Sequence, residues 1–448
     1  MSLLEQWKGA MNNQEPIAEP LPRFVGMDPT HLRRESLALN LLIQVPLYLY
    51  LCSLWLVRPL ALGDTFSLTL MAPGFLLVAL IVLRIPREFF LSKIRLVRFE
   101  FFLLLSFVLL SILSLVNSDS PIRSFRIIFP SLLPFAIFAH YVVLAWFAPH
   151  LLQRVPRLLI ACAVIFSVIP LGLTILVPPL EPLVFGSYRM KGFFENPIQH
   201  SICLATLMPL ITVEFSLAKK FRWKIFWSLL FVVMLYTLFR AGSKSAMGVA
   251  FLFSVMLYAL LAFRSRNFVK IATVLVGLVL AGIFLKLFGL MIAEMINPII
   301  AEKIRSIIEG GVSNYQSIES RKLLWEEAIR QGKMHWLVGT GAGEKVHGIS
   351  HSHNLVLDYF KGIGIFGAIG IALLCLSIIG RTGWKALTVV SGRGCEIDIR
   401  VLACLIGSTV YVICNQLSDC FGPTTIGFLW VNYLTAVFME REKPGRLG

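Results

Sequence analysis

The sequence HSHNLVLDYFKGIG, from His351 to Gly364, closes the longest part of the chain without an apolar run of membrane length. That part covers residues 291–362, and apolar runs lie on both sides of it. The pattern is typical of a bundle of membrane helices interrupted by one large polar loop. We expect this loop to form the functional face of the molecule.

The composition excludes an ordinary soluble protein. Of the 448 residues, 57% are hydrophobic and only 15% are charged, and the mean hydropathy is +0.78. The apolar runs are continuous, which favours an all-α polytopic membrane protein over a barrel of alternating strands. A spanning helix needs about 20 apolar residues. By this rule we expect about twelve spans, at residues 37–57, 66–84, 100–116, 127–148, 158–178, 200–218, 225–239, 245–263, 268–290, 363–380, 400–416 and 424–438.

The distribution of Lys and Arg predicts the orientation. With the N-terminus in the cytoplasm, 25 of the 41 basic residues fall on the inner side and only seven in the short outer loops. The positive-inside rule therefore places both termini in the cytoplasm and explains most of the net charge of +16 without a nucleic acid partner. The expected order is a cytoplasmic tail (1–36), nine helices (37–290), a large helical outer loop (291–362), three helices (363–438) and a second cytoplasmic tail (439–448).

Two pairs of basic residues lie on the outer side, against the sorting rule. Arg189 and Lys191 precede a backbone break at Asn196–Pro197, where an anion would stabilise a helix start. Arg240 and Lys244 sit between two apolar runs with almost no loop. Charges so close to hydrocarbon cost several kcal/mol unless paired or hydrated. An anion site is one explanation, and snorkelling of long side chains to the interface is the other.

The outer loop contains an expected amphipathic helix and a tight turn. Within residues 319–344, Leu323, Leu324 and Ala328 are expected to face inward, with Trp325 as a further candidate and charged side chains outward. The Gly-rich GTGAG sequence at 339–343 predicts a tight turn. It is not a nucleotide-binding loop, because no strand precedes it and no Lys–Ser/Thr follows.

His351 and His353 follow beside Asn354 and Asp358. No third ligand is evident, so we expect neither a metal nor any other cofactor. If a helix began near His351, the two rings would diverge by about 200° and only one would face the site.

The outer cations and histidines share one kind of chemistry. Arg and Lys neutralise phosphates and stabilise a leaving pyrophosphate, and a histidine can take a proton from a hydroxyl. We therefore expect a dianionic, membrane-embedded substrate. The residues expected to contact it are Arg189, Lys191, Arg240, Lys244, Arg321, His351, His353 and Asn354.

The order of motifs resembles the O-antigen ligase and polymerase superfamily of polytopic glycan transferases. The resembling parts are RMKGFFENP (189–197), SKSA (243–246), RKLLW followed by GTGAG (321–343), and HSHNLVLDYFKGIG (351–364). The resemblance implies that His353 is the catalytic base and that Arg189 binds substrate. The second basic residue of the family aligns with Lys244, whereas chemistry slightly favours Arg240, because Lys lacks the bidentate fork of Arg.

The resemblance also implies a reaction and a location. The implied reaction is the metal-independent, inverting transfer of a glycan from undecaprenyl pyrophosphate. It would take place on the periplasmic face of the bacterial inner membrane, and residues 291–362 would form the periplasmic catalytic loop. The acceptor would be lipid A–core for a ligase, or a lipid-linked glycan for a polymerase. A protein O-oligosaccharyltransferase ranks third. A transporter or flippase of an anionic lipid or sugar is the alternative from another class.

Overall fold

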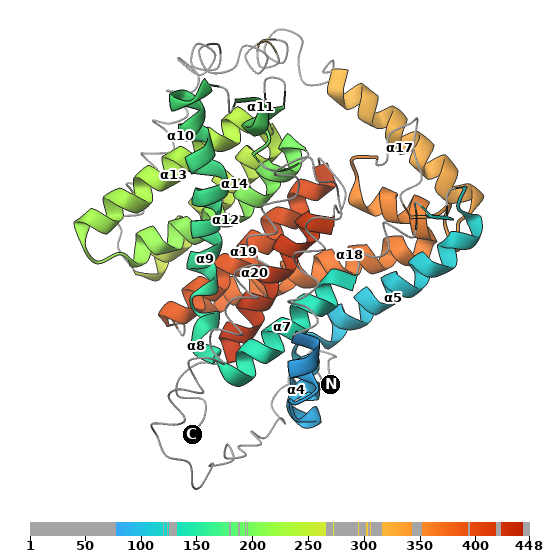
Figure 1. Cartoon of the computed structure of the whole chain (residues 1–448), viewed down its shortest axis with the longest axis horizontal. Helices are drawn as coiled ribbons and strands as arrows, with labels where there is room; N and C mark the ends of the chain where they lie inside the picture. The colour runs from blue at the N-terminus through green and yellow to red at the C-terminus, as the bar shows by residue number, and fades with distance from the viewer. Residues whose placement is uncertain are drawn as a thin grey trace.

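The computed structural model is a helical bundle (Figure 1). It describes residues 78–119, 121, 122, 124, 132–178, 181–186, 189–192, 194, 196–265, 316–342, 352–392, 395–417 and 423–441, with the single residues 272, 294, 302 and 305. The spans expected at 37–57 and 268–290, and most of that at 66–84, lie outside these residues. The long elements are α5 (Arg98–Ser114), α7 (Leu133–Phe147), α12 (Pro197–Leu217), α13 (Phe221–Ala241), α14 (Lys244–Arg264), α17 (Gln316–Met334), α18 (Leu355–Val390), α19 (Glu396–Leu417) and α20 (Pro423–Arg441).

Shorter elements connect these helices. They are α4 (Arg87–Leu96), the 3-10 turn η1 (Leu115–Asn117), α8 (Pro149–Leu152), α9 (Val155–Ala163), the π-helical turn η3 (Val164–Val168), α10 (Ile169–Leu176), α11 (Glu181–Val184) and the strands β1 (Phe185–Gly186) and β2 (Arg189–Met190). Within the described residues, seven helices are long and apolar enough to cross a membrane. This confirms a helical membrane protein. The twelve-span count and the orientation stay predictions.

The helices divide into a central and a peripheral set (Figure 1). The most apolar part of α12 and of α19 is 83% buried, whereas that of α13 and of α14 is only 28% buried. α12 packs against α13, α14 and α19, and α19 also packs against α18 and α20. Apolar side chains on the exposed faces of α13 and α14 are those expected of helices in contact with lipid.

Two expected spans differ in length from the observed helices. The span at 225–239 is one of the two shortest of the twelve, yet α13 covers all 21 residues from Phe221 to Ala241. The span expected at 363–380 is part of α18, which begins at Leu355 and runs to Val390 with a kink at Gly364. The helix begins eight residues before the expected span, because Lys361 interrupts the apolar run, although its side chain is buried in the structure.

Three buried carboxylates hold the helix ends together where the sequence predicts the cytoplasmic side. Glu214 of α12 accepts two hydrogen bonds from Arg157 and one from Arg400, at 2.9–3.1 Å. Glu100 of α5 accepts from the Tyr433 hydroxyl at 2.7 Å and pairs with Arg381 of α18 at 3.3 Å. Buried charges are tolerated when they are paired in this way.

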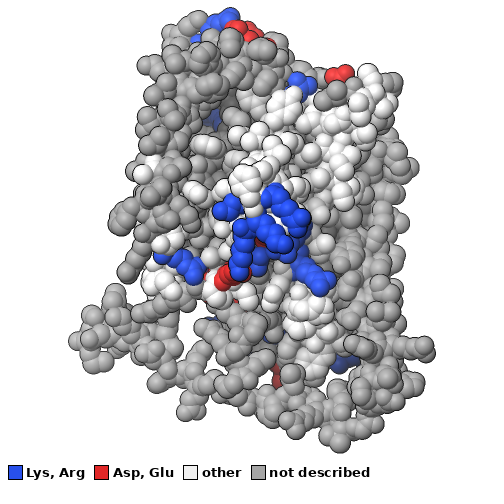
Figure 2. Space-filling model, turned by 90° about the vertical axis from the view of Figure 1, so that its left-hand side faces the viewer, with Lys and Arg blue, Asp and Glu red and all other residues white. Residues whose placement is uncertain are grey.

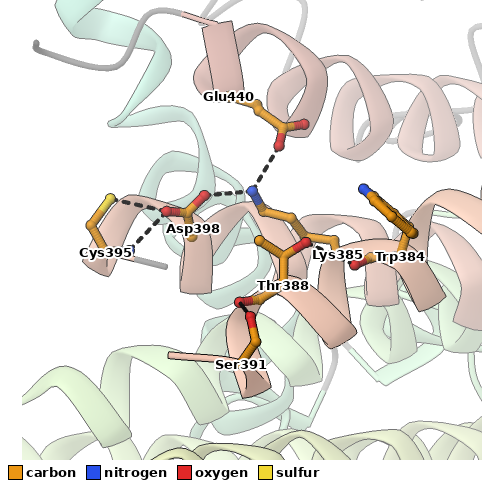
Figure 3. Close-up of polar contacts among 7 residues, drawn as sticks. All are labelled: Trp384, Lys385, Thr388, Ser391, Cys395, Asp398 and Glu440. Carbon is orange, nitrogen blue, oxygen red and sulfur yellow. Dashed lines mark hydrogen bonds and ion pairs between the residues drawn. The ribbon is translucent and has the colours of Figure 1, made fainter. Parts of the chain in front are cut away.

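The third group joins α18, α19 and α20 (Figure 3). The ammonium of Lys385 lies between Asp398 and Glu440, and it is 2.7 Å from the Glu440 carboxylate. The other Asp398 oxygen accepts the backbone N–H of Cys395 at 2.8 Å and its thiol at 3.1 Å. The Asp398 side chain is 4% exposed and that of Glu440 is 43% exposed.

This difference predicts unequal effects of two matched substitutions. Asp398→Asn leaves Lys385 buried without its buried counter-charge, which typically costs about 3–5 kcal/mol. Glu440→Gln removes a half-exposed partner and should cost about 0–1 kcal/mol. Thermal unfolding of the purified protein in detergent measures both. Equal losses of stability in the two variants would show that the burial of a carboxylate does not decide how strongly its ion pair with Lys385 stabilises the protein.

Candidate functional site

A short hairpin presents the first basic residue of the predicted site. β1 and β2 pair antiparallel, with Phe185 opposite Met190 and Gly186 opposite Arg189. Phe185 and Met190 are buried in a small apolar cluster with Leu171, Val184 and Ala241. Because side chains alternate along a strand, Arg189 points away from the side on which Met190 is buried.

Arg189 bonds to the end of α13. Its Nε donates to the carbonyl of Ala241 at 2.8 Å. The last carbonyls of a helix lack partners within the helix, so this bond satisfies one of them. The next residue, Gly242, has a φ of +71°, and a Cβ placed there would lie 2.9 Å from the Arg189 Nε. Glycine is therefore favoured at this position both by its backbone conformation and by the space that Arg189 needs.

Arg240 makes the reciprocal contact. Its guanidinium lies over the ring of Phe185, 4.9 Å from the centroid. The hairpin and the α13–α14 turn thus make two contacts, one between Phe185 and Arg240 and one between Arg189 and Ala241. The structure in this way brings together two of the predicted basic motifs. Lys191 follows β2, its side chain is half-buried, and its backbone N–H donates to Val184 at 2.9 Å. Lys244 begins α14.

A buried histidine packs against the residues that follow the hairpin. His200, in the first turn of α12, is fully buried and its Nε2 lies 2.8 Å from the hydroxyl of Ser167. Its ring lies beside that of Phe194, with centroids 5.5 Å apart. Gly192 has a φ of +55°, and a Cβ there would approach the His200 ring to 3.1 Å. No signal in the sequence pointed to Ser167, which lies in the π-helical turn η3.

His353 sits in a strained turn before α18. Its φ is +59°, a left-handed conformation that is uncommon for residues other than glycine. The Asp358 carboxylate accepts the backbone N–H of Ser352 at 2.6 Å, and the Asn354 side chain caps the helix by accepting from Leu357 at 3.1 Å. Residues held in such conformations cluster at functional sites, where neighbouring bonds fix them.

The helix begins later than one of our alternatives assumed. α18 starts at Leu355, so His353 precedes it and is not part of a regular helix. The divergence of two histidines on one helix therefore does not apply here. His351 lies outside the described residues. Asp358, which could also support a protonated imidazole, holds the turn that presents His353.

The GTGAG turn packs backbone to backbone against the start of α18. Thr340 and Gly341 donate their backbone N–H groups to the carbonyls of Lys361 and Gly362, at 2.8 and 3.1 Å. A Cβ at Gly339 would overlap the backbone of Gly362. The side chain of Asn117, at the end of η1, donates to the Gly339 carbonyl at 3.1 Å.

The same contact bends α18. Gly364 has a φ of +82°, and a Cβ there would overlap the carbonyl of Leu337. The N–H of Ile365 bonds to Trp336 at 2.8 Å, outside its own helix. We call residues 336–341 with 361–365 the glycine clamp. As expected, the GTGAG sequence is a structural turn, and its glycines serve close approach of two backbones.

α17 covers the first turns of α18. Leu324 and Ala328 are buried against Leu357, as expected from the pattern. The prediction for Leu323 was wrong, because its side chain is 61% exposed. Leu324 and Ala328 are four residues apart and therefore share the face towards α18, whereas Leu323 lies about 100° around the helix from Leu324. Arg321 is half-buried on the same helix, and within the described residues no contact joins it to Arg189 or Arg240.

The basic hairpin and the histidine turn are carried by neighbouring elements. α14 begins at the turn that Arg189 contacts, and it packs against α18, whose first turn follows His353. In Figure 1, α17 lies at the upper right of the molecule and α13 at its left.

Comparison with known proteins identifies one similar family. The family model described as O-antigen ligase matches residues 229–372. The match includes Arg240, Lys244, Arg321, His353 and the glycine clamp, whereas Arg189 lies outside it. No curated protein matches the chain. The match supports the resemblance seen in the motifs: residues 229–372 are similar to the O-antigen ligase family, whose members are membrane glycosyltransferases of the ligase and polymerase type.

Proposed function

We propose that the protein transfers a glycan from undecaprenyl pyrophosphate to an acceptor hydroxyl at the periplasmic face of the bacterial inner membrane. The acceptor is the lipid A–core of lipopolysaccharide or a second lipid-linked glycan. The observation that carries this proposal is the reciprocal contact of Arg189 with Ala241 and of Arg240 with Phe185. Arg189 and Arg240 are thus both held at the C-terminal end of α13. Two neighbouring cations are suited to binding the two phosphates of a pyrophosphate.

The fixed cations stabilise the leaving group. Transfer breaks the bond between the anomeric carbon and the pyrophosphate oxygen, so negative charge grows on undecaprenyl pyrophosphate. Guanidinium groups form strong, directional bonds to such oxygens. Because the Arg189 side chain is already oriented by Ala241, little reorganisation is needed as the charge develops. Lys191, which follows β2, and Lys244, the first residue of α14, are the further cations of the proposed site.

His353 acts as the base in this proposal. The acceptor oxygen attacks the anomeric carbon from the side opposite the pyrophosphate, which inverts the configuration. The imidazole takes the proton of the attacking hydroxyl. Asp358 and Asn354 are positioning residues, because they hold the turn and cap the helix behind it. Arg321, His351 and the Asn354 amide are further candidates for contacts with the sugar or its phosphates. No metal is part of the proposed reaction.

The acceptor is identified by deleting the gene and analysing the surface polysaccharide. Core lipid without any added glycan means that the protein is a ligase. Core lipid that carries a single repeat unit means that it is a polymerase. Unchanged lipopolysaccharide with a glycoprotein lost indicates the protein O-oligosaccharyltransferase alternative. Accumulation of lipid-linked glycan on the cytoplasmic face would contradict the proposal and favour a flippase.

The two arginines should be essential while a matched arginine is not. Arg189→Ala and Arg240→Ala each remove a charge-assisted contact worth about 1.5–3 kcal/mol, a loss of roughly 10- to 150-fold. Arg330→Ala is the control, because Arg330 is exposed on α17 and pairs with Glu327 at 2.6 Å. Glycan transfer is measured with purified protein in lipid vesicles. Near-normal transfer by both Arg189 and Arg240 variants would remove the pyrophosphate site. Lys244→Ala in the same assay decides whether Lys244 also contributes.

His353 should be essential for its imidazole and not for its backbone. Asn tolerates the left-handed conformation, so His353→Asn preserves the turn and removes the base. We expect transfer to fall by about 10²–10⁴-fold, the usual contribution of a general base. His351→Ala should leave a measurable fraction. Thermal unfolding of the His353 variant checks its fold. Full activity of His353→Asn, or loss only in the His351 variant, would move the role away from His353.

A further inference from the structure

A second charged surface lies away from the proposed active site, where α12 ends and α13 begins. Lys219, Lys220, Arg222 and Lys224 are all exposed there. We call these four residues the basic patch. Figure 2 shows Lys and Arg side chains gathered in the middle of this face of the molecule. The sequence predicts that this turn faces the cytoplasm, opposite to the side of Arg189 and His353.

Among the described residues, no carboxylate balances the charge of the basic patch. Residues 215–230 contain no Asp or Glu. In the part of the chain that the structure describes, none of the four side chains forms an ion pair. The nearest carboxylate in sequence, Glu214, is 5% exposed and is already held between Arg157 and Arg400. Arg157 is 59% exposed and adds further positive charge at the surface.

Aromatic side chains beside the basic patch locate it at the membrane interface. Trp223, Phe226 and Trp227 form consecutive edge-to-face contacts, with ring centroids 5.7 and 5.0 Å apart. Trp223 and Phe226 are exposed, on a helix that is mostly unburied along its apolar length. Tryptophan beside exposed cations at the end of a spanning helix is typical of the headgroup level of a bilayer.

A second basic segment, α4, buries one of its cations. In α4, Lys93 is buried, with its ammonium over the ring of Phe89 at 4.6 Å and near that of Phe438 at 5.9 Å. Glu88 lies in the first turn of the same helix. The charge of α4 is therefore partly used inside the protein, whereas the charge of the basic patch points outward.

We propose that the basic patch binds the headgroup phosphate of an anionic phospholipid in the cytoplasmic leaflet. The clustered cations attract the phosphate, and the exposed rings of Trp223 and Phe226 lie against the upper acyl chain. The ligand is a lipid and not a soluble anion, because the binding surface continues from charged side chains directly into an apolar helix face. This inference is independent of the proposed transfer reaction.

The test is lipid binding to the purified full-length protein. In a zwitterionic detergent the protein is titrated with phosphatidylglycerol or phosphatidylcholine, and bound lipid is counted by native mass spectrometry. The wild type should bind phosphatidylglycerol at least tenfold more tightly. The variant Lys219→Gln/Lys220→Gln/Lys224→Gln should lose this preference, by about fivefold for each charge removed.

Two control variants separate charge from structure and from position. Lys219→Arg/Lys220→Arg/Lys224→Arg keeps the charges and should keep the preference. Lys322→Gln/Lys333→Gln removes two exposed charges on α17 and should also keep it. The melting temperature without added lipid shows whether each variant is folded.

Three results would overturn the proposal. One is a wild type that binds both lipids equally, and another is a neutralised variant that keeps its preference for phosphatidylglycerol. The third is full displacement of phosphatidylglycerol by millimolar inorganic phosphate, which would indicate a site for a soluble anion.

Discussion

One hydrogen bond, from Nε of Arg189 to the carbonyl of Ala241, joins the two halves of the proposed donor site. A helix end offers carbonyl groups that need donors, and a guanidinium supplies one with a fixed direction. Gly242 leaves room for the arginine by carrying no side chain. The position of the cation is thus set by a helix terminus, and not by a flexible side chain alone. Arg240 is fixed in turn by the ring of Phe185. Such prior orientation is what electrostatic stabilisation of a leaving pyrophosphate requires.

The histidine turn depends on a comparable backbone constraint. The glycine clamp joins residues 336–341 to 361–365 through main-chain hydrogen bonds, and it bends α18 at Gly364. The first turns of α18 are therefore positioned by α17 and by the GTGAG turn together. Those first turns carry Asn354 and Asp358, which hold the strained conformation of His353. The GTGAG and KGIG sequences, about twenty residues apart, are in this sense one structural unit.

The sequence predicted the helices well and their contacts poorly. Long apolar runs predict membrane helices because the backbone must satisfy itself in lipid, and α12, α14 and α19 follow their expected spans closely. The start of α18 was missed because Lys361 looks like a loop residue and is in fact buried. Arg157, Lys385 and Arg400 were counted as loop charges, yet each pairs with a buried carboxylate. Such pairings join distant positions, so periodicity does not reveal them.

The site was predicted by residue type and not by arrangement. Outer-side cations near hydrocarbon pointed to Arg189 and Arg240, because such charges are costly without a partner. That Arg189 bonds to a main-chain carbonyl had no signal, since a backbone acceptor has no identity in the sequence. The left-handed conformation of His353 was likewise not predicted, because few residues other than glycine adopt it.

The central claim is that the Arg189–Ala241 contact orients the pyrophosphate site, and Gly242→Ala tests it most directly. This variant keeps every charge and adds one methyl group where Arg189 lies. Binding of a short-chain polyprenyl pyrophosphate to the purified protein is measured by calorimetry, with the monophosphate as control. The account predicts that Gly242→Ala remains folded and loses at least tenfold in affinity for the pyrophosphate, with a smaller change for the monophosphate. A folded variant that binds the pyrophosphate as tightly as the wild type would contradict it.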